Sequence, residues 1–400
     1  MLFRKVKRAL HILSKLPLYI LAIPAVVVIR LIKPWLLVRL GGLFSGRIGH
    51  FGANTEMYLC EIDAGINVPK QRYLDLHFMW MPICNQQLAT MWKRVLHVWP
   101  SWILVPILRV NRLIPRGEAH EIGNNTQHDR DVHNLLDQFS PHLEFTSEEE
   151  RKGLAEINNL GIPNNASWIC FHARNPYYLQ EILPDGDWRY NDYLNCDIKK
   201  FIPAAEELCR RGNFLVRTGA IVKEPLEITH PQIVDYAWNF RSEFLDIYLG
   251  AKCKFYLLSP TGIYAVPAIF RRPVAIVNVA SVEYVVSWGR NNLSIFKKFW
   301  LIKEKRFMTF QEIFDSGAGR FLQTKQFELL GVELIENTPE EITALAVEMD
   351  ERLNGTWQTT EEDEELQRRF WAIFPKTELN GVCRARIGTE FLRQHQDWLK

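Results

Sequence analysis

The chain has 400 residues, of which 47% are hydrophobic, 12% aromatic and 24% charged. A chain of this length accommodates two domains, and this composition excludes disordered, collagen-like and mucin-like proteins. The formal net charge is only +2, but residues 1–55 carry nine basic side chains and no acidic one. A basic end on an otherwise acidic chain disfavours a nucleic-acid-binding protein and is typical of attachment to an anionic membrane surface.

The N-terminal segment 1–36 is predicted to be a membrane-associated helix. Five basic side chains within residues 1–15 are interleaved with apolar ones, and an uncharged stretch of 14 residues follows from Leu16 to Ile29. A bilayer-spanning helix needs about 20 apolar residues, so Arg30 and Lys33 end the stretch too early for an ordinary crossing. We therefore expect a monotopic or peripheral helix on the cytoplasmic face of the inner membrane, with a signal anchor or a buried helical hairpin as alternatives.

The seven cysteines are scattered along the chain and never form a C-x-x-C pair. This pattern favours neither a zinc site nor a disulfide framework, and no metal ion or cofactor is predicted. Cysteines of this kind are typical of a reducing compartment, so we expect the body of the protein on the cytoplasmic side.

Residues 37–160 are predicted to form the first of two Rossmann-like lobes. An apolar strand ending at Leu40 is followed by five glycines between positions 41 and 52, which are typical of a loop. Thr55 is expected to cap a helix that runs toward Asp63, and a strand over 73–78 and a helix over 85–97 follow. This order of strand, glycine-rich turn and helix is that of a dinucleotide-binding lobe, although the G-x-G-x-x-G spacing is absent.

Residues 161–340 are predicted to form the second lobe, after a helix that begins with a capping box at Thr146 and Glu149. The predicted strands cover 168–171, 214–216, 254–258 and 273–278, and the predicted helices cover 198–211, 242–249 and 262–270. Strands that alternate with helices of this length indicate a parallel sheet with helices on both faces, which is an α/β fold. Residues 341–400 are predicted to be helices that pack back on the first lobe.

Unusual residues follow three of the predicted strands: His172 and Arg174, then Arg217 and Gly219, then Ser259, Thr261 and Gly262. Ligands of parallel sheets bind beyond the carboxyl ends of the strands. An arginine there supplies a planar fork of donors for a diphosphate, and the Ser-Pro-Thr-Gly turn offers hydroxyls and helix amides to the same anion. The sequence therefore predicts an anion-binding site at this edge, with His172 as either a ligand or a structural hydrogen-bonding residue.

Two further pairs of charged residues each have two possible roles. Glu243 and Asp246 lie three residues apart on the helix after Ser242, where they either bind a ribose or sugar hydroxyl or act as a helix cap and its solvated neighbour. The pair Lys297-Lys298 contacts a phosphate or is solvated, and we expect it to be solvated.

Several short motifs are distributed over most of the chain beyond the N-terminal segment. They are Ile48-Gly49-His50, Asn54-Thr55-Glu56, Cys170-Phe171-His172-Ala173-Arg174, Asp192-Tyr193, Asn195-Cys196-Asp197-Ile198, Leu215 to Gly219, Pro231, Ile233 to Tyr236, Ser242 to Ile247, Ser259 to Gly262, and Ala385 to Gly388. Together they resemble a bacterial glycosyltransferase family that is distantly related to the fucosyltransferases with an H-x-R signature.

This resemblance implies a GT-B-type fold with two Rossmann-like lobes, in which the second lobe binds the nucleotide-sugar and the acceptor lies between the lobes. It also implies that Arg174 grips the donor pyrophosphate and that transfer needs no metal ion. The chain departs from the family pattern at Asn175 and Leu194, where arginine is frequent. These departures leave the donor sugar open.

An inverting transfer needs a base that takes the proton of the acceptor hydroxyl. The glycine-rich segment of the first lobe contains His50 and ends at Glu56. His50 is the predicted base because the ordinary pKa of histidine lies near neutral pH, and Glu56 is a further catalytic candidate beside Arg174. The alternative is that His50 bonds a neighbouring carbonyl and only shapes the loop.

The sequence therefore predicts a membrane-associated glycosyltransferase of the hexosyl- or deoxyhexosyl-transferase type, acting in cell-surface polysaccharide biosynthesis. It would move a sugar from a nucleotide-diphosphate-sugar, a co-substrate rather than a cofactor, to a lipid-linked or surface-glycan acceptor. A catalytically silent, membrane-associated nucleotide or nucleotide-sugar binding protein is the alternative. A phosphohydrolase or kinase is disfavoured because the chain has no P-loop, and no nucleic-acid partner is expected.

Overall fold

The computed structural model describes residues 2–123, 129–182 and 184–400, with side chains from residue 16 onward. The chain divides into two compact units, Met1–Asp129 and Arg130–Lys400, called the N-terminal and C-terminal units below. This division comes before the expected boundary at residue 160. The reason is that α5 (Ser147–Asn159) belongs to the C-terminal unit, where Glu150 accepts hydrogen bonds from Tyr248 and Lys252.

The N-terminal unit is built around two parallel strands. Its elements are α1 (Leu2–Leu31), β1 (Leu37–Leu43), α2 (Ile48–Asp63), β2 (Tyr73–Met79), α3 (Gln86–Val95) and α4 (Ser101–Arg112). β1 and β2 pair in parallel, with Leu37 opposite Tyr73 and Leu43 opposite Met79. The expected strand–helix–strand order is therefore present, but the sheet of the described residues in this unit has only two strands rather than the wider sheet of a full Rossmann lobe.

Most of the segment predicted to be a glycine-rich loop is regular structure, since Gly41 and Gly42 lie in β1 and Gly49 and Gly52 lie in α2. α2 begins at Ile48, so His50 and Glu56 lie on helical backbone, and Thr55 does not cap the helix. Its hydroxyl instead donates to the carbonyl of Phe51 at 2.8 Å, one turn earlier in the same helix. The apolar face of α2 is buried, and this burial outweighs the low helix propensity of its glycines.

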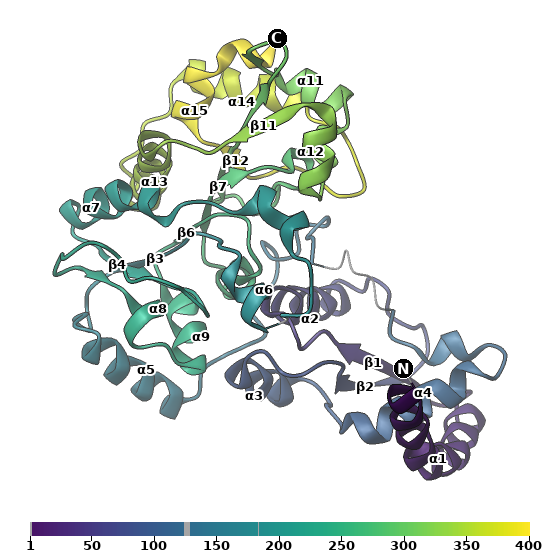
Figure 1. Ribbon diagram of the computed structural model, residues 1–400. Helices are drawn as coiled ribbons and strands as arrows, with labels where there is room; N and C mark the ends of the chain where they lie inside the picture. The colour runs from purple at the N-terminus through teal and green to yellow at the C-terminus, as the bar shows by residue number, and fades with distance from the viewer. Residues whose placement is uncertain (1, 124–128, 183) are drawn as a thin grey trace. The chain divides into compact units, whose positions relative to one another are not determined.

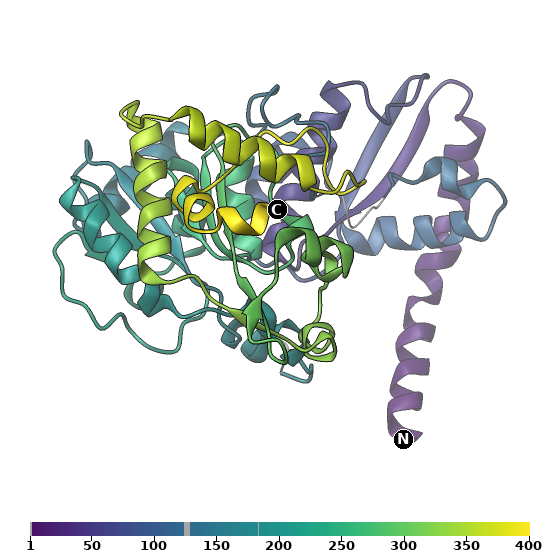
Figure 2. The same cartoon turned by 90° about the horizontal axis from the view of Figure 1, so that it is seen from above.

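α1 packs against α4 within the N-terminal unit, and Figure 1 shows the two helices side by side. Arg30, near the end of α1, turns its guanidinium inward onto the carboxyl end of α4. It donates to the side chain of Asn111 at 2.9 Å and to the carbonyls of Ile114 and Pro115 at 3.1 and 3.0 Å. Figure 2 shows the first turns of α1 extending past the other elements of this unit. No helix among the described residues is both long and apolar enough to cross a bilayer.

The C-terminal unit contains the parallel sheet that the sequence predicts. Its strand order is β12-β8-β7-β6-β3-β4-β5, and all neighbours run in parallel. The strands are β3 (Trp168–His172), β4 (Phe214–Arg217), β5 (Ile233–Val234), β6 (Tyr256–Leu258), β7 (Val274–Val279), β8 (Leu293–Phe296) and β12 (Arg386–Ile387). The α/β class is thereby confirmed for this unit.

Helices cover both faces of this sheet, with α7 and α13 on one side and α5, α8 and α9 on the other (Figure 1). They and the shorter helices are α6 (Tyr177–Ile182), α7 (Ile202–Arg210), α8 (Tyr236–Asn239), α9 (Glu243–Lys252), α10 (Ala265–Ile269), α11 (Phe310–Asp315), α12 (Thr324–Leu330), α13 (Pro339–Asn354), α14 (Glu361–Ile373) and α15 (Thr389–Gln394). A separate antiparallel sheet has the order β10-β9-β11, formed by β10 (Arg306–Phe307), β9 (Lys298–Leu301) and β11 (Val332–Ile335). The capping box at Thr146 and the cap at Ser242 are both present.

The sequence predicts that the helices of residues 341–400 pack back on the first lobe, but the structure assigns them to the C-terminal unit. Phe370 of α14 stacks on Phe296 at the end of β8, and Phe391 of α15 meets the same ring edge to face. These aromatic side chains are part of the hydrophobic core that contains the parallel sheet. α14 and α15 pack on the parallel sheet of the C-terminal unit rather than on the first lobe because amphipathic helices pack where they bury the largest apolar area.

The pair Lys297-Lys298, expected to be solvated, is buried. Lys298 donates to Glu341 of α13 at 2.9 Å, and the ring of His395 lies 3.2 Å from the other carboxylate oxygen of Glu341. Burial alone would raise the pKa of Glu341, but the hydrogen bonds from His395 and Lys298 outweigh it and lower that pKa to about 2. The carboxylate is therefore held in its charged form.

This arrangement predicts acid sensitivity. A carboxylate whose folded pKa lies below its unfolded value contributes stability above the unfolded pKa, and that stability is lost as the pH falls from about 4.5 toward 2. We expect Glu341→Gln to lower the free energy of unfolding at neutral pH by about 3 kcal/mol and to flatten its dependence on pH in this range. Urea unfolding at several pH values measures both effects. The control is Glu362→Gln, which removes an exposed carboxylate of α14, and an unchanged pH slope in Glu341→Gln would contradict the prediction.

Candidate functional site

A cavity of about 890 Å³ lies in the C-terminal unit, at the carboxyl ends of β3 and β4. Its walls come from the residues after β3 (172–177), the segment after β4 (217–227), the segment 192–203, Lys297, and residues between 324 and 336. Cavities of this size at this edge of a parallel sheet are where small ligands bind. Three of the predicted donor-binding residues, His172, Arg174 and Arg217, line it.

Arg174 lines this cavity, where its guanidinium is hydrogen-bonded by neutral groups and Asp192 attracts its charge from beyond ion-pair distance. Its Nη1 donates to the carbonyl of Asn191 at 3.1 Å and to the side-chain oxygen of Asn195 at 2.8 Å. Within the described part of the chain, no acidic group forms an ion pair with this guanidinium. Burial lowers the pKa of Arg174, which shows that its surroundings disfavour the cation.

Lys297 is a second cation in the same cavity. The sequence offers it as a phosphate contact, but the expectation is a solvated side chain. Its side chain is 5% exposed, and its Nζ donates to the backbone carbonyl of Asn195 at 2.8 Å. Burial lowers the pKa of Lys297, the thiol of Cys196 and the carboxylate of Glu336 oppose this, and the charges of Lys200 and Arg174 lower the pKa further. The available signal is position, because Lys297 follows directly after β8, at the carboxyl end of a parallel strand.

Asn195 joins the two cations. Its side-chain oxygen accepts from Arg174 and its backbone oxygen accepts from Lys297, so the two positive groups are held on one residue at the cavity wall. Two like charges kept close together in a partly buried place are costly unless an anion lies between them. The arrangement is therefore suited to binding a multiply charged anion.

His172 lines the cavity as a neutral imidazole. Its Nδ1 lies 2.8 Å from the carbonyl oxygen of Thr218 and therefore donates to it, which leaves Nε2 as an acceptor. Burial lowers the pKa of His172 to about 4. Gly219 packs against this ring, since a Cβ at that position would lie 3.4 Å from Nδ1. His172 thus offers the cavity an acceptor for a hydroxyl and not a positive charge.

Arg217 lines the cavity but is offset by its own partner. Its Nη1 lies 3.1 Å from the carboxylate of Asp235 and donates to the carbonyl of Glu224 at 2.9 Å. The same carboxylate accepts from the backbone of Leu226 at 2.7 Å. The pair ties β4 to the segment that follows it, so this arginine contributes less net positive charge to the cavity than Arg174 does.

The predicted turn at Ser259, Thr261 and Gly262 does not line the cavity. Ser259 is buried and accepts a hydrogen bond from the backbone N–H of Arg174 at 2.8 Å, so it fixes the end of β3. The guanidinium of Arg174 points instead to the segment of Asn191 and Asn195. The helix expected from residue 262 to 270 is present as a 3-10 turn (Gly262–Tyr264) that continues into α10 (Ala265–Ile269).

Glu243 and Asp246 lie on α9 and are likewise absent from the cavity wall. Asp246 is buried, accepts from the hydroxyl of Tyr236 at 2.9 Å and forms an ion pair with Arg241 at 2.8 Å. Burial raises the pKa of Asp246. This carboxylate belongs to an internal network, which is nearer to the capping alternative than to sugar binding.

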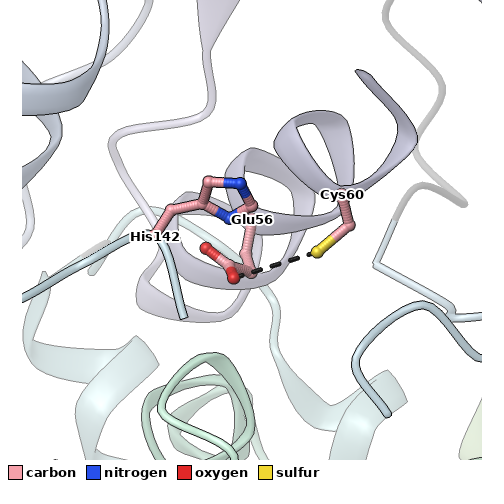
Figure 3. A group of neighbouring side chains, drawn as sticks. All are labelled: Glu56, Cys60 and His142. Atoms are coloured by element: carbon pink, nitrogen blue, oxygen red, sulfur yellow. Dashed lines mark hydrogen bonds between the residues drawn. The ribbon is translucent and has the colours of Figure 1, made fainter. Parts of the chain in front are cut away.

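The catalytic candidates His50 and Glu56 lie on α2 of the N-terminal unit. His50 is half-buried, and its Nδ1 lies 3.2 Å from the side-chain oxygen of Asn54. Glu56 is buried one helical turn before Cys60, whose thiol donates to the Glu56 carboxylate at 3.9 Å (Figure 3). Both side chains are thus fixed by neighbours on the same helix.

The sequence matches no protein-family model and no curated protein. Among solved structures, the chain is similar to a family 9 glycosyl transferase from Veillonella parvula, at 12% identity over 60% of this chain and 80% of that one, with a TM-score of 0.37. It is also similar to ADP-heptose LPS heptosyltransferase II of E. coli, at 12% identity over 73% and 98% of the two chains, with a TM-score of 0.41. A third similar structure is the heptosyltransferase TibC of E. coli, at 10% identity over 61% and 60% and a TM-score of 0.31. Similarity at this level does not assign an activity to the chain.

Proposed function

We propose that this protein is a glycosyltransferase that moves a sugar from a nucleotide-diphosphate-sugar to a lipid-linked or surface-glycan acceptor. The observation that carries the proposal is the pair Arg174 and Lys297, two cations without carboxylate partners among the described residues, held together by Asn195 in the cavity of the C-terminal unit. A diphosphate has the charge and the several acceptor oxygens that such a pair binds. The motifs around His172 and Arg174 support the same assignment by resemblance.

In the proposed reaction, the bond between the sugar and the diphosphate breaks while the acceptor hydroxyl attacks the sugar carbon from the opposite side, with inversion. Arg174 and Lys297 neutralise the charge that develops on the leaving diphosphate, which lowers the barrier and makes a metal ion unnecessary. His172, neutral and with Nε2 as an acceptor, positions a hydroxyl of the donor.

His50 is the proposed base. When its Nδ1–H donates to Asn54, its Nε2 carries the free electron pair that takes the proton of the acceptor hydroxyl. Glu56 is proposed as the further catalytic carboxylate on the same helix.

A thermal-shift screen against nucleoside diphosphates tests the proposal, because a ligand that binds the folded state raises its melting temperature. Matched monophosphates should give a smaller shift, since they lack the second phosphate. Incubation with nucleotide-diphosphate-sugars would then distinguish an enzyme from a catalytically silent binding protein, because a glycosyltransferase slowly hydrolyses its donor. A chain that binds nucleotide-sugars but neither hydrolyses nor transfers them with any acceptor would be the silent binding protein.

We also propose that the N-terminal unit lies on the cytoplasmic face of the inner membrane through α1, as a peripheral or monotopic attachment. The exposed face of α1 from Leu16 to Leu31 is apolar, and Leu21 is 72% exposed. Arg30, which interrupts the apolar stretch in the sequence, is turned away from this face toward α4. Trp35, 75% exposed, follows the helix, as tryptophan does at the level of lipid headgroups.

Substitution on this face is expected to release the protein from membranes. Because Leu21 and Leu31 are exposed, the double variant Leu21→Glu, Leu31→Glu should fold normally but bind vesicles of mixed neutral and anionic phospholipid at least about tenfold more weakly. Vesicle flotation measures the bound fraction. Leu329→Glu, at a leucine of the C-terminal unit that is 78% exposed, is the matched control. Equal flotation of the double variant and the wild type would contradict the attachment.

A further inference from the structure

One buried side chain of the N-terminal unit has polar atoms without partners. His77 lies on β2, opposite Gly41 of β1, and is 3% exposed. Neither of its ring nitrogens has a hydrogen-bond partner within the described chain. Its backbone is fully used, since its N–H donates to the carbonyl of His97 and its carbonyl accepts from Trp99. Buried polar groups of this kind normally bind water or a ligand.

His77 is one of the residues that line a small pocket of about 40 Å³ within the same unit. The pocket lies between the carboxyl-end half of the two parallel strands and α2, which contributes Asn54, Thr55 and Tyr58. The hydroxyls of Thr55 and Tyr58 already donate, to the carbonyl of Phe51 and to Asp75 respectively. The volume is enough for a hydroxyl or hydroxymethyl group, or for a few water molecules.

The charges around the pocket favour a neutral ligand. The acidic neighbour of His77, Asp75, is bound by Arg39 at 2.6 Å and by Tyr58, so it offers no free charge. Burial lowers the pKa of His77 to about 4, so the ring is neutral at physiological pH. A neutral imidazole has one donor and one acceptor nitrogen, and a hydroxyl complements either of them.

We propose that this pocket binds a hydroxyl group of a neutral sugar or polyol, with His77 as its hydrogen-bond partner. The inference stands on the N-terminal unit alone and is independent of the nucleotide site in the other unit. If the proposed function also holds, the sugar bound here is the acceptor, and His77 positions it.

Histidine-labelled full-length protein provides the test. We expect the His77 ring ¹⁵N resonance, assigned by its loss in His77→Phe, to move on addition of millimolar methyl glycosides of glucose, galactose or mannose, or of glycerol. Equilibrium dialysis with the same radiolabelled glycosides should show at least tenfold weaker binding to His77→Phe. His97→Phe, at an exposed histidine of the same unit, should bind as the wild type does.

The outcomes separate clearly. A His77 resonance that no glycoside or glycerol moves would overturn the proposal and leave the pocket with structural water only, as would equal binding by His77→Phe. His77→Gln, which keeps a donor and an acceptor, is the second variant if the phenylalanine variant does not fold, and partial retention of binding supports the proposal. A protein that binds a glycoside through His77 but no nucleoside diphosphate would support this inference and contradict the proposed function.

Discussion

Arg174→Ala is expected to weaken nucleoside diphosphate binding about 10- to 100-fold, the size of one or two charge-assisted hydrogen bonds to phosphate. The arginine lies in the cavity of the C-terminal unit, and no carboxylate among the described residues forms an ion pair with it, so its donors are available to the anion. Lys297→Met should produce a loss of similar size, because methionine fills the space of the lysine stem without its charge. Titration calorimetry measures both dissociation constants.

Two controls separate binding from folding. Arg189→Ala removes an exposed arginine that pairs with Asp187, and it should leave the dissociation constant unchanged. Melting temperatures of the ligand-free variants show whether loss of the contacts to Asn195 disturbs the fold. Affinity equal to that of the wild type in both Arg174→Ala and Lys297→Met would remove the diphosphate assignment.

Arg217→Met is expected to destabilise the protein by about 3–5 kcal/mol, since it breaks a buried ion pair and leaves Asp235 without its partner. Replacing both partners should be far milder, so the double variant Arg217→Met, Asp235→Asn is expected to recover most of the lost stability. Urea unfolding of the two single variants and the double variant gives the coupling between the residues.

The same variants test what Arg217 does in the cavity. Because Asp235 offsets its charge, we expect the double variant to change nucleoside diphosphate affinity by less than about threefold. A loss in the double variant as large as that of Arg174→Ala would instead make Arg217 a direct ligand of the diphosphate. Failure of the double variant to recover stability would contradict the structural role assigned to the pair.

The sequence predicts β3, β4, β6 and β7 of the C-terminal sheet because these strands are short, buried and separated by clear helix signals, but it does not predict β5, β8 or β12. The caps at Thr146 and Ser242 are local features that depend on a few neighbouring residues. The helical conformation of 48–56 and the packing of 341–400 could not be predicted in this way. Both depend on which apolar surfaces meet in three dimensions, and composition alone indicates a loop for the first and does not identify the partner of the second.

The sequence predicts where the site lies, but it does not predict which side chains in the site bind one another. Residues at strand ends were expected to meet, and His172, Arg174 and Arg217 do line one cavity. The sequence does not show that Asp235 offsets Arg217, or that Asn195 brings Lys297 to Arg174, because these partners are separated by long stretches of chain. Long-range contacts of side chains decide which of several strand-end cations keeps a free charge.

The most direct test of the central claim is a crystal structure of the full chain with a bound nucleoside diphosphate. The account predicts that the phosphate oxygens lie within hydrogen-bond distance of both the Arg174 guanidinium and Lys297 Nζ, beside Asn195. A diphosphate bound at the turn of residues 259–262, or anywhere else with these two cations left uncontacted, would contradict it.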